Sequence, residues 1–107
     1  MVDSAVVETV RGFLRKVEQR GVDVRFGVIF GSWAKGTAGE WSDIDLLVVS
    51  PRYDQPFTHK DAMLLWHVAA EDASGIQPLP CGEKQWREDD ASHIIEIGRR
   101  EGEKVLP

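Results

Sequence analysis

Residues 30–49 read FGSWAKGTAGEWSDIDLLVV and connect two segments with the composition of β-strands. The first segment, residues 24–30, is rich in β-branched and aromatic residues and ends at Gly31, where a tight turn is expected. The second segment, residues 44–49, is apolar at almost every position, which is typical of a strand buried on both faces within a sheet. The connection therefore places three glycines and the acidic pair Asp43 and Asp45 between two strands.

Two long helices flank this region in the sequence. Apolar residues recur at helical spacing from residue 4 to residue 20, and Gly21 ends this amphipathic helix. A second helix is predicted over residues 58–73, where Thr58 and Asp61 resemble a capping box. Its predicted core-facing stripe consists of Ala62, Leu65, Trp66 and Ala69.

The last third of the chain contains weaker signals. Residues 76–80, IQPLP, include two prolines that cannot donate hydrogen bonds to a neighbouring strand, so we expect this segment at a sheet edge. A polar helical region is expected over residues 83–102 and a short strand over residues 104–106. The predicted buried side of that helical region carries Trp86, Ile94, Ile95 and Ile97. These elements predict one small α/β (α+β) domain over residues 1–107, in which helices flank a mixed sheet of about three to four strands.

Composition excludes several classes of protein. The 107 residues are 42% apolar and 29% charged, as in ordinary globular domains. No segment approaches the roughly 20 apolar residues of a membrane span and no signal peptide is evident, so we expect a cytoplasmic protein without a membrane partner. The single cysteine, Cys81, is expected in a loop and fits neither a disulfide nor a zinc site. A net charge of −5 disfavours long nucleic acid as a partner.

Asp43 and Asp45 are two residues apart at a strand, so their carboxylates leave the same face while Ile44 and Leu46 face the other way. Crowded carboxylates repel each other, and divalent cations are the usual means of stabilising such a pair. The alternative is structural: Asp43 caps a turn and Asp45 is an incidental charge at the strand opening. The pair taken alone does not choose between these interpretations.

The residues before the acidic pair favour a ligand site. Gly31 and Ser32 are expected at the start of a short helix, where backbone N–H groups suit a phosphate and the serine hydroxyl can donate to it. Lys35 lies one turn further and can reach the same phosphates, while Gly36 and Gly39 reverse the chain toward the acidic strand. Phosphate donors opposite metal-binding carboxylates are the minimum needed for chemistry on a nucleoside triphosphate.

This pattern resembles the signature of the polymerase-beta-type nucleotidyltransferases: Gly31-Ser32, ten intervening residues, then Asp43-Ile44-Asp45. The resemblance is to the minimal nucleotidyltransferases of about this length, which are often encoded beside a helical HEPN-domain partner in toxin–antitoxin pairs. It implies the nucleotidyltransferase fold, a triphosphate bound by Gly31 and Ser32, and two Mg²⁺ ions held by Asp43 and Asp45; the position of Lys35 adds it to the expected nucleotide-binding residues.

The sequence departs from the family pattern at two positions. The family's third carboxylate comes from the later strand, and the matching position here is Gln77, a neutral residue that cannot act as a general base. Glu83 is the nearest acid downstream and would compensate if the chain folded back. Trp33 stands where many relatives carry a basic residue, and is expected to pack or to stack on a base.

Two functions follow from the resemblance. One is a magnesium-dependent enzyme that moves a nucleoside monophosphate, AMP from ATP, to a tyrosine or serine hydroxyl on a HEPN-type partner protein. The other is a binding module in which Gln77 weakens or abolishes catalysis and the fold regulates a partner by contact. Trp33, Trp41 and Trp66 are candidate anchors for such a partner, with core packing expected for Trp66. The sequence leaves the acceptor, the preferred base and the choice between a homo- and a hetero-oligomer open.

Overall fold

The computed structural model describes residues 2–39, 42–56, 58–72 and 75–107. Its helices are α1 (Ser4–Gln19), α2 (Ser32–Lys35), α3 (His59–Asp72), α4 (Glu83–Glu88) and α5 (His93–Glu101), with a 3-10 turn η1 (Pro51–Asp54). Its strands are β1 (Phe26–Phe30), β2 (Ile44–Val49), β3 (Ile76–Cys81) and β4 (Glu103–Val105). The predicted α/β class is confirmed, and β2 has the bounds expected from the sequence.

The strands within the described residues form one mixed sheet of four in the order β3-β2-β1-β4. β1 runs antiparallel to both of its neighbours, whereas β2 and β3 run parallel, with Ile44 beside Ile76 and Val49 beside Cys81. The parallel pair is joined by a crossover that contains α3, as parallel strands require. β2 therefore lies inside the sheet and β3 at its edge, both as expected.

The edge position of β3 accommodates its prolines. The carbonyl oxygens of Gly75 and Cys81 accept from the backbone N–H groups of Ile44 and Ser50, at 2.9 and 3.0 Å. Backbone groups alternate in direction along a strand, so the odd-numbered residues of β3 face β2, and Pro78 and Pro80 face outward. The two missing N–H groups therefore cost no bond within the sheet.

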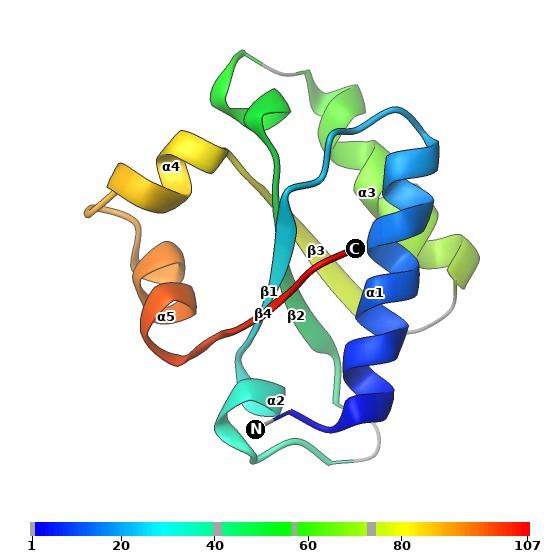
Figure 1. The fold of residues 1–107 in the computed structure, drawn as a ribbon, viewed down its shortest axis with the longest axis vertical. Coiled ribbons are helices and arrows are strands. Elements are labelled where there is room, and N and C mark those ends of the chain that lie inside the picture. Colours follow the sequence, from blue (N-terminus) through cyan, green and yellow to red (C-terminus); the bar gives the residue numbers. More distant parts are fainter. Residues whose placement is uncertain (1, 40–41, 57, 73–74) are drawn as a thin grey trace.

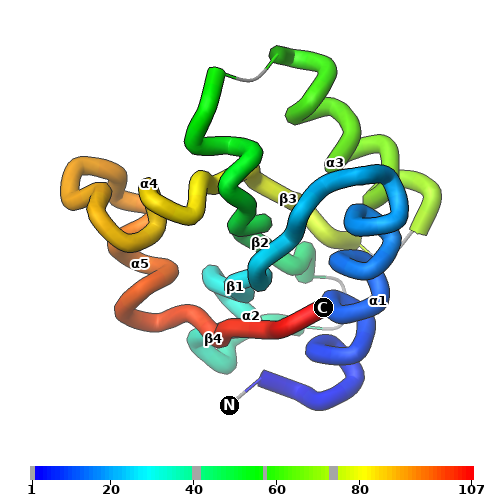
Figure 2. Tube along the Cα trace, turned by 45° about the horizontal axis from the view of Figure 1, so that its top comes forward, coloured from blue at the N-terminus to red at the C-terminus, as the bar shows by residue number. Residues whose placement is uncertain are grey.

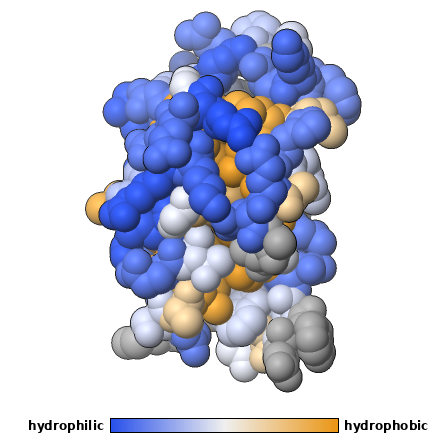
Figure 3. Space-filling view, turned by 90° about the vertical axis from the view of Figure 1, so that its right-hand side faces the viewer, coloured by the Kyte–Doolittle hydropathy of each residue, from blue (hydrophilic) through white to orange (hydrophobic). Residues whose placement is uncertain are grey.

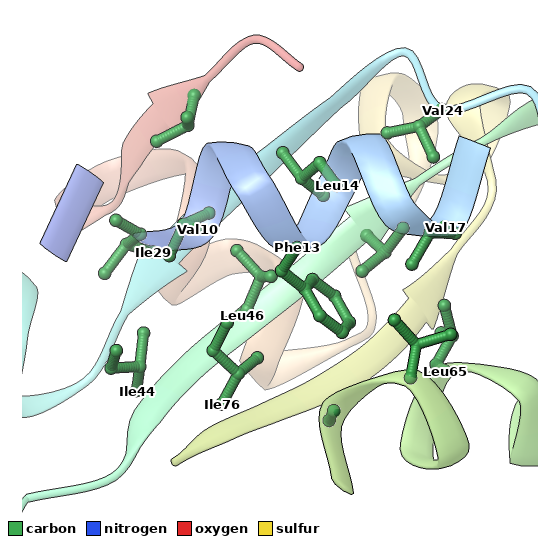
Figure 4. Packing of buried hydrophobic residues seen from close by; sticks show 14 of the residues in the cluster. Val10, Phe13, Leu14, Val17, Val24, Ile29, Ile44, Leu46, Leu65 and Ile76 are labelled. Atoms are coloured by element: carbon green, nitrogen blue, oxygen red, sulfur yellow. The ribbon is translucent and has the colours of Figure 1, made fainter. Parts of the chain in front are cut away.

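Helices cover both faces of the sheet. Figure 1 shows α1 and α3 on one side of the strands and α4 and α5 on the other. The larger core lies beneath α1 and α3, where Phe13 of α1 points toward Leu46 of β2 (Figure 4) and has no exposed surface. The strand residues of this core include Ile29, Ile44, Leu46, Val48, Ile76 and Val105. Burying large apolar side chains in this way contributes about 1.5–3 kcal/mol each.

The second core is smaller and lies beneath α4 and α5. It consists of Val28, Leu47, Val49, Cys81 and Ile95. Trp86 of α4 packs its ring edge-on to Phe26, with 5.7 Å between the centroids, and the Arg99 guanidinium lies 6.0 Å from the Trp86 ring. Figure 2 shows α4 and α5 lying together on this side of the sheet.

Two expectations about single residues are wrong. Trp66 does not belong to the core: it is 42% exposed, because the buried residues of α3 are Leu65, Val68 and Ala69, and Trp66 lies about 100° around the helix from Leu65. Cys81 is not in a loop but is the last residue of β3, 1% exposed. Burial raises the pKa of the Cys81 thiol to about 11, which makes it a poor nucleophile.

The expected helical region at residues 83–102 is divided into α4 and α5. The Asp89 carboxylate accepts hydrogen bonds from the backbone N–H groups of Ala91 and Ser92, each at 2.8 Å, and this turn ends α4. Ser92 then caps α5 through the N–H of Ile95. The break changes the helical phase, so Ile95 is buried while Ile94 is 43% exposed. Gly102 ends α5 as expected.

Within the described residues, no helix combines the length and the apolar character that crossing a membrane demands.

Candidate functional site

Three strands bring the predicted site residues to one end of the sheet. Gly31 follows the last residue of β1, Asp43 directly precedes β2 and Asp45 is its second residue, and Gln77 is the second residue of β3. Asp45 is paired with Phe30 on one side and with Gln77 on the other. The order across the sheet is therefore the glycine turn, the two aspartates and Gln77, with α2 beside the turn at the lower end of Figure 1.

Gly31 lies directly against Asp45. Its φ of 73° lies in the region that favours glycine, and a Cβ built on it would lie 2.2 Å from Oδ2 of Asp45. No residue with a side chain fits this position without displacing the carboxylate. The turn therefore allows the backbone that starts α2 to approach Asp45 within contact distance.

Gln77 contacts the other member of the pair. Its side-chain Nε2 donates a hydrogen bond to Oδ2 of Asp43, with 2.8 Å between the atoms. The sequence comparison with the family pattern placed Gln77 at the third acidic position, and its register pairing with Asp45 puts it beside both aspartates. A neutral amide thus lies where a third carboxylate is expected, and it binds one of the two remaining acids.

The charges of the site are concentrated on Asp43 and Asp45. Partial burial, with a further contribution from the negative charge of Asp43, raises the pKa of Asp45 above its ordinary value. Asp45 is half-buried, whereas Ile44 and Leu46 on either side are buried in the main core, so the predicted alternation of faces is confirmed. Among the described residues, no three His, Cys, Asp or Glu side chains converge in a way that could hold a metal ion.

The remaining donor types nevertheless fit a hard divalent cation. Two carboxylates with an amide close by are oxygen donors of the kind that Mg²⁺ prefers, and Mg²⁺ usually keeps several waters in place of protein ligands. Asp43 and Asp45 would hold such an ion, whose positive charge would offset the burial and the Asp43 repulsion that together raise the pKa of Asp45.

The other predicted nucleotide-binding residues lie on α2. Ser32 is its first residue, and the exposed Lys35 is its last. The Lys35 ammonium lies 4.0 Å from Oε2 of Glu101 on α5, so the predicted phosphate contact competes with an ion pair. Trp33 packs against the main core, and its indole N–H donates to the carbonyl of Ser42 at 3.3 Å. Packing, rather than stacking on a base, is therefore the role that the contacts of Trp33 support.

Glu83 does not join the site. It begins α4, beyond the opposite end of β3, and its carboxylate lies 3.3 Å from the guanidinium of Arg25, just before β1. The expectation that Glu83 supplies the missing third carboxylate is therefore wrong, because the length of β3 separates Glu83 from Gln77. Trp41 lies outside the described residues.

A cavity of about 220 Å³ adjoins the site and was not expected from the sequence. It is bordered by Asp43 and Gln77 and by the α3 residues Trp66, Ala69 and Ala70. Nothing in the sequence clearly signalled it, because Trp66 was expected in the core and only the structure shows that its side chain is exposed. Through Trp66, α3 thus contributes to the same cavity as Asp43.

Comparison with known proteins agrees with this geometry. The model of the nucleotidyltransferase domain family matches residues 10–100 of the chain. A candidate protein adenylyltransferase of Methanocaldococcus jannaschii is 51% identical over 39 residues, which are 36% of this chain and 26% of that protein. The matched segment thus spans about a quarter of the relative.

Two solved structures share the fold. A candidate nucleotidyltransferase from Sulfolobus solfataricus superposes with a TM-score of 0.63 at 20% identity, covering 94% of this chain and 77% of that one. A toxin–antitoxin structure with AMP-PNP superposes with a TM-score of 0.60 at 19% identity, covering 92% and 70%.

Proposed function

This chain belongs to the nucleotidyltransferase domain family, and we propose that it transfers a nucleoside monophosphate, AMP from ATP, to a hydroxyl group on a partner protein. The observation that carries the proposal is the contact between Gly31 and Asp45 at the end of the sheet. It brings a turn suited to phosphate and a pair of carboxylates suited to a divalent cation into one site.

Each part of the site has a separate task in this proposal. Gly31, Ser32 and Lys35 would bind the β- and γ-phosphates, and Asp43 and Asp45 would hold Mg²⁺. The acceptor oxygen bonds to the α-phosphorus, the bond from that phosphorus to the bridging oxygen breaks, and pyrophosphate leaves. The hydroxyl proton passes to water, because the Gln77 amide cannot act as a base. Bound Mg²⁺ supplies positive charge that neutralises the phosphates and the leaving group.

The choice of AMP and of a protein acceptor is supported by the relatives. The M. jannaschii protein is described as a protein adenylyltransferase, and one structural neighbour is a toxin–antitoxin complex with an ATP analogue. The resemblance to minimal nucleotidyltransferases suggests a small helical HEPN-type protein as the acceptor.

A second candidate function rests on the hydrogen bond from Gln77 to Asp43. If this amide in place of a carboxylate prevents the transfer, the chain binds nucleotide and regulates its partner by contact alone. The two functions differ in covalent labelling, whereas both predict nucleotide binding.

The test begins with Mg²⁺ and α-labelled ATP, incubated with the purified chain and the product of the adjacent gene. The enzyme proposal expects label on the partner with the wild-type chain and none with Asp43→Asn. An absence of label with wild type, together with preserved binding of a fluorescent ATP analogue, would support the binding module instead. An absence of binding as well would contradict both functions.

A further inference from the structure

The cavity between α3 and β3 lies on the side of the aspartates opposite the glycine turn. Gly31 is at the β1 side of Asp45, whereas Gln77, on β3, borders the cavity together with Asp43. The proposed triphosphate site, the carboxylates and the cavity therefore follow one another across the sheet. This order gives the cavity a defined position relative to a reaction at Asp43 and Asp45.

The lining of the cavity combines apolar and polar groups. Trp66, Ala70 and Ile76 supply apolar surface, while the Asp43 carboxylate and the Gln77 amide supply hydrogen-bonding groups. Figure 3 shows that the side of the molecule carrying α1 and α3 is mostly hydrophilic, with hydrophobic atoms exposed in a limited area. A lining of this kind suits a ligand with a flat apolar body and a polar tip.

The cavity is too small to enclose a whole nucleotide. Its volume of about 220 Å³ is below the roughly 300–1,000 Å³ of pockets that enclose complete small-molecule ligands. A single side chain with a ring fits this space better than a nucleoside with its phosphates. The exposed face of Trp66 offers a stacking surface for such a ring.

The direction from which the acceptor oxygen must approach indicates what the cavity binds. In-line displacement at the α-phosphorus requires the attacking oxygen to approach opposite the leaving pyrophosphate. If pyrophosphate leaves toward Gly31 and Ser32, the acceptor approaches from the β3 side, where the cavity lies. Resting on the proposed function, we infer that this cavity seats the side chain that carries the acceptor hydroxyl, an aromatic hydroxyl held against Trp66.

In this arrangement Trp66 and Gln77 are positioning residues for the acceptor. The ring of the acceptor stacks on Trp66, and its hydroxyl lies near the amide of Gln77 and the carboxylate of Asp43. The Gln77 amide, which donates to Asp43 in the structure, also offers its carbonyl oxygen to a hydroxyl donor. Gln77 can therefore hydrogen-bond the acceptor hydroxyl without adding a negative charge beside it, as a third carboxylate would.

The test follows the indole N–H signals of the ¹⁵N-labelled chain by nuclear magnetic resonance. The chain has four tryptophans, and the Trp66 signal is assigned by its loss in Trp66→Phe. With Mg²⁺ and a non-hydrolysable ATP analogue present, N-acetyltyrosinamide is expected to shift the Trp66 signal saturably. The Trp86 signal, from the other face of the sheet, is expected to stay in place.

Two substitutions test the cavity itself. Ala70→Leu fills it from an exposed helical position, and is expected to weaken N-acetyltyrosinamide binding about fivefold or more because the ring loses its space. Ala91→Leu makes the same change at an exposed position between α4 and α5 and is expected to leave that affinity unchanged. Neither substitution is expected to alter the affinity for the ATP analogue.

Three results would overturn the inference. They are an unmoved Trp66 signal with nucleotide bound, an equal response to N-acetylserinamide, and a response to adenosine in place of the tyrosine probe. The last of these would make the cavity a seat for the base. Failure of the proposed function is recognised separately: loss of nucleotide binding leaves the backbone signals of Gly31 and Ser32 unmoved by the ATP analogue, and loss of transfer alone appears as absent label on the partner protein.

Discussion

Gln77 donates its side-chain amide to Asp43 across the parallel pair of strands, with 2.8 Å between Nε2 and Oδ2. The bond ties the acidic pair of β2 to the edge strand and occupies one of the carboxylate oxygens through which Asp43 would hold a cation. Because Gln77 is neutral, residue 77 adds no negative charge to that of the two aspartates. The metal affinity and the rate of any transfer are therefore expected to depend on residue 77.

Replacing Gln77 by glutamate tests this dependence with a side chain of the same shape. Without metal, the new carboxylate would oppose Asp43, and Gln77→Glu is expected to lower the free energy of unfolding by about 1 kcal/mol. With Mg²⁺ we expect Gln77→Glu to become more stable than wild type, because its third carboxylate binds the ion more tightly. At a Mg²⁺ concentration 100 times the dissociation constant of a protein, binding raises its free energy of unfolding by about 2.7 kcal/mol. Thermal unfolding in EDTA and in Mg²⁺, with calorimetric titration of Mn²⁺, measures both effects. Equal Mn²⁺ affinities in the two proteins would contradict the expectation.

Gly31→Ala is expected to disrupt the acidic pair. The added Cβ would meet Oδ2 of Asp45 at 2.2 Å, and a φ of 73° strains any residue other than glycine. We expect a loss of about 1–3 kcal/mol in urea unfolding from the backbone strain, together with loss of Mn²⁺ binding. Gly36→Ala is the matched control, because its φ of 76° is similar while no atom lies within 4 Å of the added Cβ. If Gly36→Ala abolished Mn²⁺ binding equally, strain rather than the collision with Asp45 would be responsible.

The raised pKa of Asp45 predicts a dependence of stability on pH. Because the folded chain holds this proton more tightly than the unfolded chain, protonation stabilises the fold. This contribution is complete below the ordinary value of 3.8 and is lost as the pH rises through the raised value in the folded chain. In EDTA, Asp45→Asn is therefore expected to be more stable than wild type at pH 7, by a margin that shrinks toward pH 4.

Chemical unfolding across this pH range checks the sign of the effect. Asp90→Asn, at an exposed position between α4 and α5, controls for the removal of one negative charge. A margin that grows as the pH falls would contradict the assignment. Saturating Mg²⁺ is expected to stabilise wild type and to leave Asp45→Asn nearly unchanged.

Lys35 and Glu101 allow nucleotide binding to be separated from folding. Both side chains are substantially exposed and their charged atoms are 4.0 Å apart, so this ion pair contributes at most about 1 kcal/mol to stability. Lys35→Met is expected to weaken binding of a fluorescent ATP analogue while leaving the melting temperature within about 2 °C. Glu101→Gln frees the ammonium and is expected to strengthen binding. Opposite changes in affinity from the two variants support Lys35 as a phosphate ligand, and unchanged affinity in both would exclude it.

The sequence was most informative where one local pattern dominates. The apolar run of β2, the prolines of β3 and the capping box before α3 all correspond to the structure, where Thr58 and Asp61 exchange hydrogen bonds through their backbone N–H groups. Such features depend on a few neighbouring residues, and these residues retain their preferences in the folded chain.

The sequence was least informative where the structure depends on the angular position of a residue around its helix or on contacts between residues far apart in the chain. The apolar character of Trp66 says nothing about its angle around α3, and the stripe of Leu65, Val68 and Ala69 turns its ring outward. The division between α4 and α5 depends on Asp89 accepting from Ala91 and Ser92, which competes with continued helix. The bond between Gln77 and Asp43 joins residues 34 apart in the chain, and only the parallel register of β2 and β3 brings them together.

The outward-facing Pro78 and Pro80 restrict how another protein can approach this edge. A strand that extends a sheet needs alternating donors and acceptors on the free side of the edge strand. Here two successive donors are missing from that side, so an incoming strand would leave two of its own carbonyl groups unpaired. A partner that reaches the aspartates from the β3 side is therefore expected to dock through side chains, and the chain to resist edge-to-edge aggregation at the border nearest its candidate site.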